Sequence, residues 1–159
     1  MRELGSDSII CFPPLAKILT IQKTGGNIVK EITRINHIGL RVKDLDISRK
    51  FYEKLGFVFL VGPVGPEPVA IMEHPSGVNI NFILNADKGC KENILMDISV
   101  KHTGYTHIAL EVTNVISAST AVKALGIKIT DEVEYEGAKF FFIRDPDSNV
   151  IEFHQPASS

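Results

Sequence analysis

The chain has 159 residues, of which 44% are apolar and 23% are charged, a composition that suits one folded domain with a single sizeable core. Its formal net charge of −2 leaves no basic surface of the kind that nucleic acid or an anionic membrane requires. We therefore expect a small molecule as the partner, with no nucleic acid and no membrane.

The first thirty residues differ in character from the rest. The apolar run IICFPPLAKILTI is interrupted by Pro13 and Pro14 and follows a segment with acidic residues, which disfavours a signal peptide. We expect residues 1–30 to be a loosely attached extension and residues 31–156 to be the domain. The two cysteines, Cys11 and Cys90, form no pattern, which favours a reducing, cytoplasmic setting over a disulfide framework.

An internal repeat organises the domain. HIGLRVKDL, which begins at position 37, matches HIALEVTNV, which begins at position 107, and EKLGF matches KALGI at the same offset. Further along, HPSGVNINF from position 74 matches DPDSNVIEF from position 145, after one residue is gained in a loop. Residues 32–85 and 104–155 are therefore predicted to be two copies of one structural unit.

The elements predicted in chain order are the same in both units. Residues 35–42 read as a strand, and a helix follows that is capped by Asp44 and ends at Gly56. Residues 105–112 repeat the strand, and Asn114 and Gly126 bound the second helix. Three short strands complete each unit: FVFLV, VAIME and VNINFIL, then IKITDEV, KFFFI and NVIEFH. The sequence thus predicts an α+β fold of two tandem βαβββ modules.

Strand alternation assigns the polar side chains to one face. Apolar residues at every second position should pack under the helix, so His37 and His107 should point to the opposite face. In the last strand of each unit the same face carries Asn81 and Glu152. The repeat therefore offers four equivalent positions: His37, Asn81, His107 and Glu152.

Two imidazoles and a carboxylate on rigid strands are a donor set for a borderline divalent metal. Three protein ligands would leave coordination positions open for water, substrate or dioxygen. We predict His37, His107 and Glu152 as the ligands, and expect Asn81 to hydrogen-bond a metal-bound water or the substrate.

Two further side chains share a face with these predicted ligands. Tyr105 lies two positions before His107, and His154 lies two positions after Glu152. They are the candidates for proton transfer or for support of the ligands.

The segments INHIGLRVKDLDISRKFYEKLGF, YTHIALEV and DPDSNVIEF resemble the vicinal oxygen chelate superfamily. This superfamily includes glyoxalase I, bleomycin-resistance proteins, methylmalonyl-CoA epimerase, fosfomycin-resistance enzymes and extradiol dioxygenases. The resemblance covers about residues 32–155. It implies paired βαβββ modules that form a half-barrel around a divalent metal, commonly in a homodimer and sometimes with modules exchanged between chains.

The second ligand position departs from the four-ligand members of that superfamily, which have Glu or Gln there. Asn81 is shorter and cannot act as a carboxylate base, which disfavours a glyoxalase I or epimerase mechanism that takes its base from this position. The remaining trio is similar to that of extradiol dioxygenases, so Fe(II) or Mn(II) is favoured, whereas zinc or nickel would fit the lyase and isomerase branch.

Two other groups of the superfamily offer alternative functions. Fosfomycin-resistance enzymes use the same trio, but the residues after Glu152 include no Arg or Lys to hold a phosphonate. Bleomycin-resistance proteins sequester a drug without metal catalysis. We predict a metal-dependent enzyme acting on a small oxygen-chelating substrate, with extradiol-type dioxygenase chemistry first. A glyoxalase-like lyase or isomerase, a fosfomycin-type enzyme and a metal-free drug-binding protein are the alternatives.

Overall fold

A computed structural model of the chain describes residues 29–89 and 92–158. The chain divides into two units, Met1–Arg34 and Ile35–Ser159, and all the helices and strands among the described residues belong to the second unit. Most of the expected extension at 1–30, including Cys11, lies outside the described residues, and so does Cys90.

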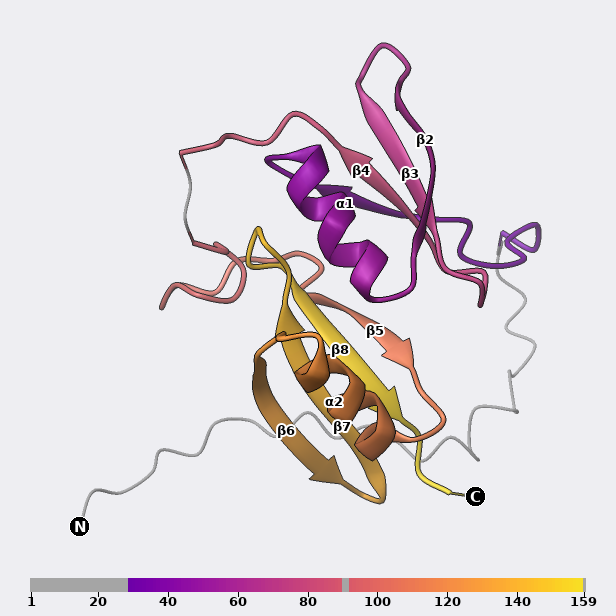
Figure 1. Ribbon diagram of the computed structural model, residues 1–159, viewed down its shortest axis with the longest axis vertical. Helices are drawn as coiled ribbons and strands as arrows, with labels where there is room; N and C mark the ends of the chain where they lie inside the picture. The colour runs from indigo at the N-terminus through magenta and orange to yellow at the C-terminus, as the bar shows by residue number, and fades with distance from the viewer. Residues whose placement is uncertain (1–28, 90–91, 159) are drawn as a thin grey trace. The chain divides into compact units, whose positions relative to one another are not determined.

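The first module places one helix on a four-stranded sheet (Figure 1). Its elements are β1 (Ile38–Arg41), α1 (Leu45–Lys54), β2 (Val58–Val64), β3 (Val69–Glu73) and β4 (Asn79–Ile83). The strand order is β1-β4-β3-β2, with β1 parallel to β4 and the other neighbours antiparallel.

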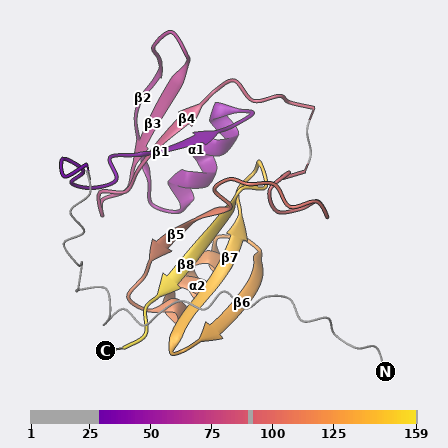
Figure 2. The same cartoon turned by 180° about the vertical axis from the view of Figure 1, so that it is seen from behind.

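The second module repeats this arrangement. Its elements are β5 (His107–Glu111), α2 (Val115–Ala124), β6 (Ile129–Tyr135), β7 (Ala138–Arg144) and β8 (Val150–Gln155). The strand order is β5-β8-β7-β6, with β5 parallel to β8. In the reverse view the strands of this module lie in front of α2 (Figure 2). Two βαβββ modules of an α+β fold are thus present, as predicted from the repeat.

Three details differ from the expected elements. The first strand begins at Ile38, so His37 lies just before it. Strand β2 continues through Gly62 and Pro63 to Val64 with irregular register, because an edge strand tolerates a residue that cannot donate to the ladder. Finally, no strand of one sheet pairs with the other sheet among the described residues, so the chain alone does not close the two sheets into the expected half-barrel.

Helix capping follows the sequence in both modules. The Asp44 side chain accepts from the Ile47 amide at 3.0 Å, and the Asn114 side chain accepts from the Ser117 amide at 2.8 Å. These bonds satisfy amides that have no partner inside the helix. Both helices therefore begin at equivalent positions of the two modules.

The core lies between each helix and its sheet. Tyr52 is 1% exposed and its ring contacts Phe51, Phe57 and Phe82. Val122, at the equivalent position of the second helix, is 3% exposed. The first module therefore fills this position with a large aromatic ring and the second with a small aliphatic side chain.

The turn before β8 links the second module to the first. The Tyr52 hydroxyl donates to Asp145 at 3.3 Å, and the amide of Lys43 donates to Asp147 at 3.0 Å. Burial raises the pKa of the Asp145 carboxyl, against hydrogen bonds from Asn149 that lower it. Burial, followed by the nearby charge of Asp145, raises the pKa of Tyr52. Both effects disfavour ionisation of these two groups.

In the described part of the chain, neither helix is both long and apolar enough to cross a membrane.

Candidate metal-binding face of the second module

His107 and Glu152 come together on the face of the second sheet that points away from α2. His107 Nε2 lies 2.9 Å from Glu152 Oε2, although Glu152 pairs with Ala109 in the strand register. The Glu152 residue is 7% exposed, and burial of an unpaired carboxylate would be costly. Its location therefore depends on the imidazole beside it.

His154 contacts the other oxygen of the same carboxylate. His154 Nδ1 lies 2.7 Å from Glu152 Oε1, and its ring stacks on Phe140 with centroids 5.3 Å apart and planes 12° apart. Phe142 meets His107 edge to face at 5.9 Å and Phe140 at 5.7 Å. The carboxylate is therefore held between two imidazoles and bordered by two aromatic rings.

The third predicted ligand, His37, is not brought to this pair within one chain. No three His, Cys, Asp or Glu side chains among residues 29–89 and 92–158 gather in a group that could hold a metal ion. His37 Nδ1 instead lies 2.9 Å from Asn36 Oδ1. A cavity of about 1120 Å³ is lined by His37 and His107, together with Tyr105, whose side chain is fully exposed at 100%.

Asn81 occupies the position in the first module that Glu152 occupies in the second. It pairs with Gly39 across β1 and β4, as Glu152 pairs with Ala109. The Asn81 Oδ1 atom is buried and has no hydrogen-bond partner. An orphaned acceptor of this kind suits a donor supplied from outside the chain, such as a water or a substrate hydroxyl.

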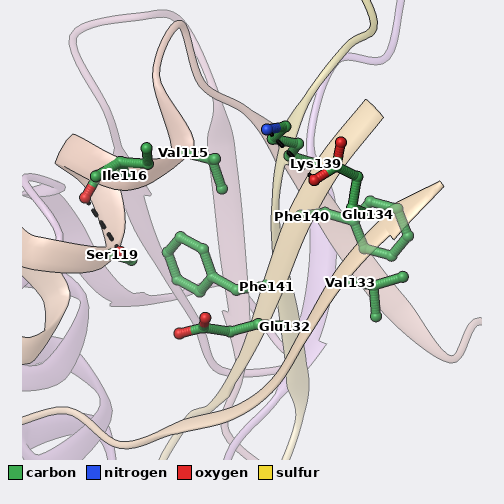
Figure 3. A pocket seen from close by; sticks show the side chains of 9 residues that line it. All are labelled: Val115, Ile116, Ser119, Glu132, Val133, Glu134, Lys139, Phe140 and Phe141. Carbon is green, nitrogen blue, oxygen red and sulfur yellow. Dashed lines mark hydrogen bonds and ion pairs between the residues drawn. The ribbon is translucent and has the colours of Figure 1, made fainter. Parts of the chain in front are cut away.

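A smaller cavity of about 250 Å³ lies on the other side of the second sheet, between α2 and β6–β7 (Figure 3). Val115, Ser119 and Phe141 line it, and a Lys139–Glu134 ion pair lies at its edge. None of the predicted site residues takes part in it, so we do not assign the ligand chemistry to this cavity.

The donor atoms of His107 and Glu152, on the face of the second sheet that points away from α2, suit a divalent metal. Imidazole nitrogen and carboxylate oxygen are ligands that iron, manganese, zinc and nickel share. The carboxylate is buried and its second oxygen is held by His154, the arrangement expected around a ligating carboxylate. The residues therefore fit such a group, with two of the three predicted ligands already adjacent.

Sequence reasoning missed several members of this face. The sequence pattern predicts Phe140 and Phe142 only as strand residues, whereas the strand register places them beside His154 and Glu152. Asn36 and Thr106 were also passed over, and each contacts the Nδ1 atom of the histidine that follows it. Their equivalent positions in the repeat were the available signal.

The fold and this donor set define the class of protein. The family model of the glyoxalase/bleomycin resistance protein/dioxygenase superfamily matches residues 34–153. The chain belongs to this superfamily.

Individual relatives narrow the comparison. A lactoylglutathione lyase of Haemophilus influenzae is 32% identical over 133 residues, which cover 79% of this chain and 95% of that protein. A glyoxylase/bleomycin resistance protein/dioxygenase domain from Frankia sp. has a TM-score of 0.66 at 19% identity, covering 80% of this chain and 95% of that one. A mutant of the FosX fosfomycin resistance protein of Listeria monocytogenes, complexed with Mn(II) and dihydroxypropylphosphonic acid, has a TM-score of 0.56 at 21% identity, covering 77% of this chain and 90% of that one. At these identities the two structures establish the fold alone.

Proposed function

We propose that the protein is a divalent-metal-dependent enzyme with His37, His107 and Glu152 as metal ligands. The observation that carries the proposal is the approach of His107 Nε2 to Glu152 Oε2 at 2.9 Å around a buried carboxylate. When bound, a divalent metal supplies Lewis-acid stabilisation of negative charge on a chelating substrate oxygen and, as Fe(II), reactivity toward dioxygen.

The chain's own residues would bind and orient a small oxygen-chelating substrate. The unpaired Oδ1 of Asn81 would accept a hydrogen bond from a substrate hydroxyl or a bound water. Phe140 and Phe142 offer apolar surface next to the ligands, where a planar carbon skeleton could pack. Tyr105, which lines the large cavity, is the candidate for proton transfer to or from the substrate.

Extradiol-type oxygenation is the first reaction to test, with Fe(II) or Mn(II) as the metal. It needs three protein ligands and open positions for two substrate oxygens and dioxygen, and no fourth side chain as a base. A glyoxalase I or epimerase mechanism would take its base from the position of Asn81. An amide cannot accept a proton at neutral pH, so this position favours the reaction that needs no base there.

A lyase of the glyoxalase type is the second candidate. It is favoured by the likeness to lactoylglutathione lyase at 32% identity over nearly the whole of that protein. This reading requires a base other than Asn81, and zinc or nickel would suit it as the metal.

The complete site would form between two copies of the chain. His37 does not gather with the other two ligands among the described residues. Strand β1, which follows His37, and strand β5, which begins at His107, are edge strands. Each has one side without a strand partner among residues 29–89 and 92–158, and such edges are open to pairing with another chain. A homodimer would then combine His37 of one chain with His107 and Glu152 of the other.

Metal content is the primary test. Protein purified without air or chelator should contain close to one iron or manganese per chain, and a His107→Ala variant should contain none. Oxygen uptake with catechols would then support dioxygenase chemistry, whereas conversion of methylglyoxal with glutathione would support the lyase. If neither protein binds metal after divalent ions are supplied, the proposal of a metal-dependent enzyme would be overturned and a metal-free drug-binding protein would be favoured.

Mixing two inactive variants tests the shared site. His37→Ala and His107→Ala chains, unfolded and refolded together, should regain metal in mixed dimers, because one of the two sites then keeps all three ligands. Each variant refolded alone is the control. Failure of the mixture to bind more metal than the controls would place all three ligands in one chain.

A further inference from the structure

His37 is held by the residue before it. Its Nδ1 lies 2.9 Å from Asn36 Oδ1, and an amide oxygen can only accept a hydrogen bond. Nδ1 must therefore carry the proton in this contact. In the neutral ring Nε2 is then the nitrogen with a free lone pair.

The second histidine repeats the contact with a different residue. His107 Nδ1 lies 2.9 Å from Thr106 Oγ1, and Thr106 occupies the position of Asn36 in the repeat. A hydroxyl can donate or accept, so Thr106 can hold Nδ1 whether or not that nitrogen is protonated. Glu152 Oε2 accepts from Nε2 at 2.9 Å. Once Nε2 binds a cation instead, Nδ1 carries the proton and Thr106 would accept from it.

The carboxylate is held on one side in the same way. Glu152 Oε1 accepts from His154 Nδ1 at 2.7 Å, and the stack on Phe140 fixes the plane of that imidazole. The first module has Ile83 and Val69 at the positions of His154 and Phe140. There the equivalent Asn81 Oδ1 has no partner, so the supporting imidazole occurs only in the module that carries the acid.

We propose that Asn36, Thr106 and His154 are positioning residues that select which atom of each ligand faces the metal. They hold Nδ1 of His37, Nδ1 of His107 and Oε1 of Glu152, and so present Nε2, Nε2 and Oε2. The inference rests on the proposed function. Residues that bond the second atom of a ligand set its tautomer and orientation, and their loss lowers metal affinity about 10- to 100-fold.

A chance surface contact would not be expected to recur in both modules. Asn36 and Thr106 differ in size, backbone preference and chemistry, yet they share an oxygen and place it 2.9 Å from Nδ1 in both copies. What the repeat preserves is the contact and not the residue type. This is the pattern expected if the contact has a role.

The first experiment measures the ring tautomers without any metal. In metal-free protein, ¹⁵N chemical shifts should show Nδ1 of His37 protonated in the wild type. Asn36→Leu should shift His37 toward a mixture of tautomers, whereas Asn36→Asp, which keeps an acceptor oxygen, should restore the Nδ1–H form. An unchanged His37 spectrum in Asn36→Leu would overturn this part of the proposal.

The second experiment measures Mn(II) affinity from the electron paramagnetic resonance signal of the free ion. Thr106→Val, which is nearly isosteric, should weaken binding about 10- to 100-fold, and Thr106→Ser should stay close to wild type. Thr120→Val in α2 is the matched control, since its hydroxyl donates to Ile116 in the helix. Equal affinities of Thr106→Val and the control would overturn the role of Thr106.

The third comparison separates the hydrogen bond of His154 from its stacking. His154→Phe can keep the stack on Phe140 but loses the donor, whereas His154→Asn keeps an N–H donor and loses the stack. The phenylalanine variant should lose about 10- to 100-fold in Mn(II) affinity, and the asparagine variant should recover part of it. Wild-type affinity in His154→Phe would show that the imidazole is only structural.

The outcomes for the two proposals can be told apart. Wild-type protein that binds no Mn(II) would remove the metal-dependent function, and the metal-free tautomers of the Asn36 variants would still decide whether the histidines are held. Wild-type protein that binds Mn(II), with all supporting variants unchanged, would remove this inference and leave the ligand assignment intact.

Discussion

The two modules share one backbone plan but differ on the face opposite their helices. At equivalent positions the first has Asn81 and Ile83 where the second has Glu152 and His154. The first face therefore contributes one imidazole and an unpaired amide oxygen, and the second contributes a carboxylate held by two imidazoles. The repeat preserves the fold while the charge and its support are concentrated in one copy.

The cores of the two modules also differ, and here the first module has the larger side chain. In the first module Tyr52 fills the space under the helix, and its hydroxyl donates to Asp145 in the turn before β8. The equivalent Val122 is also buried but has no hydrogen-bonding group on its side chain. The module that is poorer in polar ligand groups thus carries the larger core anchor, and that anchor contacts the loop leading to Glu152. Each module supplies something that the other lacks.

Removing the carboxylate should have the largest effect on metal binding. Glu152→Ala takes away a direct ligand and leaves two imidazoles, so Mn(II) affinity should fall by more than about 100-fold, beyond the range for supporting residues. Asn81→Ala, its repeat equivalent, should cost less than about tenfold because an amide is a weak ligand. Both affinities are measured by titration, and equal losses would contradict the asymmetry between the faces.

The core comparison predicts a large difference in stability. Tyr52→Ala removes a buried ring with three aromatic contacts and should lower the free energy of unfolding by about 3–5 kcal/mol. Val122→Ala removes two methyl groups and should cost roughly 1.5–2 kcal/mol. Denaturant unfolding of both variants checks this. A larger loss in Val122→Ala would show that the second core, and not the first, dominates stability.

Much of this arrangement could be predicted because it depends on local period and on repetition. Alternation assigned His37, His107 and Glu152 to the face away from the helices, and the repeat exposed Asn81 as the departure. The relation of His37 to the other two could not be predicted, because alternation fixes a face and not the distance between two sheets. The Tyr52–Asp145 contact was also missed, since its residues are 93 positions apart and neither shows a periodic signal for the other.

The glycines that end the helices allow a finer comparison. Gly56 and Gly126 have φ angles of 93° and 73°, so alanine at either position should cost about 1 kcal/mol or more from left-handed strain. A Cβ at Gly56 would lie 3.1 Å from His74 Nε2, whereas at Gly126 nothing lies within 4 Å. Gly56→Ala should therefore be the more destabilising in thermal unfolding, unless His74 can turn away, in which case the two losses would be equal.

The smallest effect concerns the contact between Tyr52 and Asp145. Burial raises the folded-state pKa of Asp145 above its value in the unfolded chain. As pH rises through the interval between these two values, the unfolded chain releases this proton first, so the contribution of Asp145 to stability falls; it is most favourable below the unfolded pKa. Asp145→Asn keeps an oxygen for the amides of Asp147 and Asn149 but cannot titrate.

The unfolding free energy of the wild type minus that of the variant should therefore decrease as pH rises across this acidic window in a series of denaturant titrations. An increase would mean that the Asn149 hydrogen bonds outweigh burial and hold the carboxyl ionised. In that case the turn before β8 would hold an ionised carboxylate in the interior, and the contrast between the interior of this module and its ligand face would be lost.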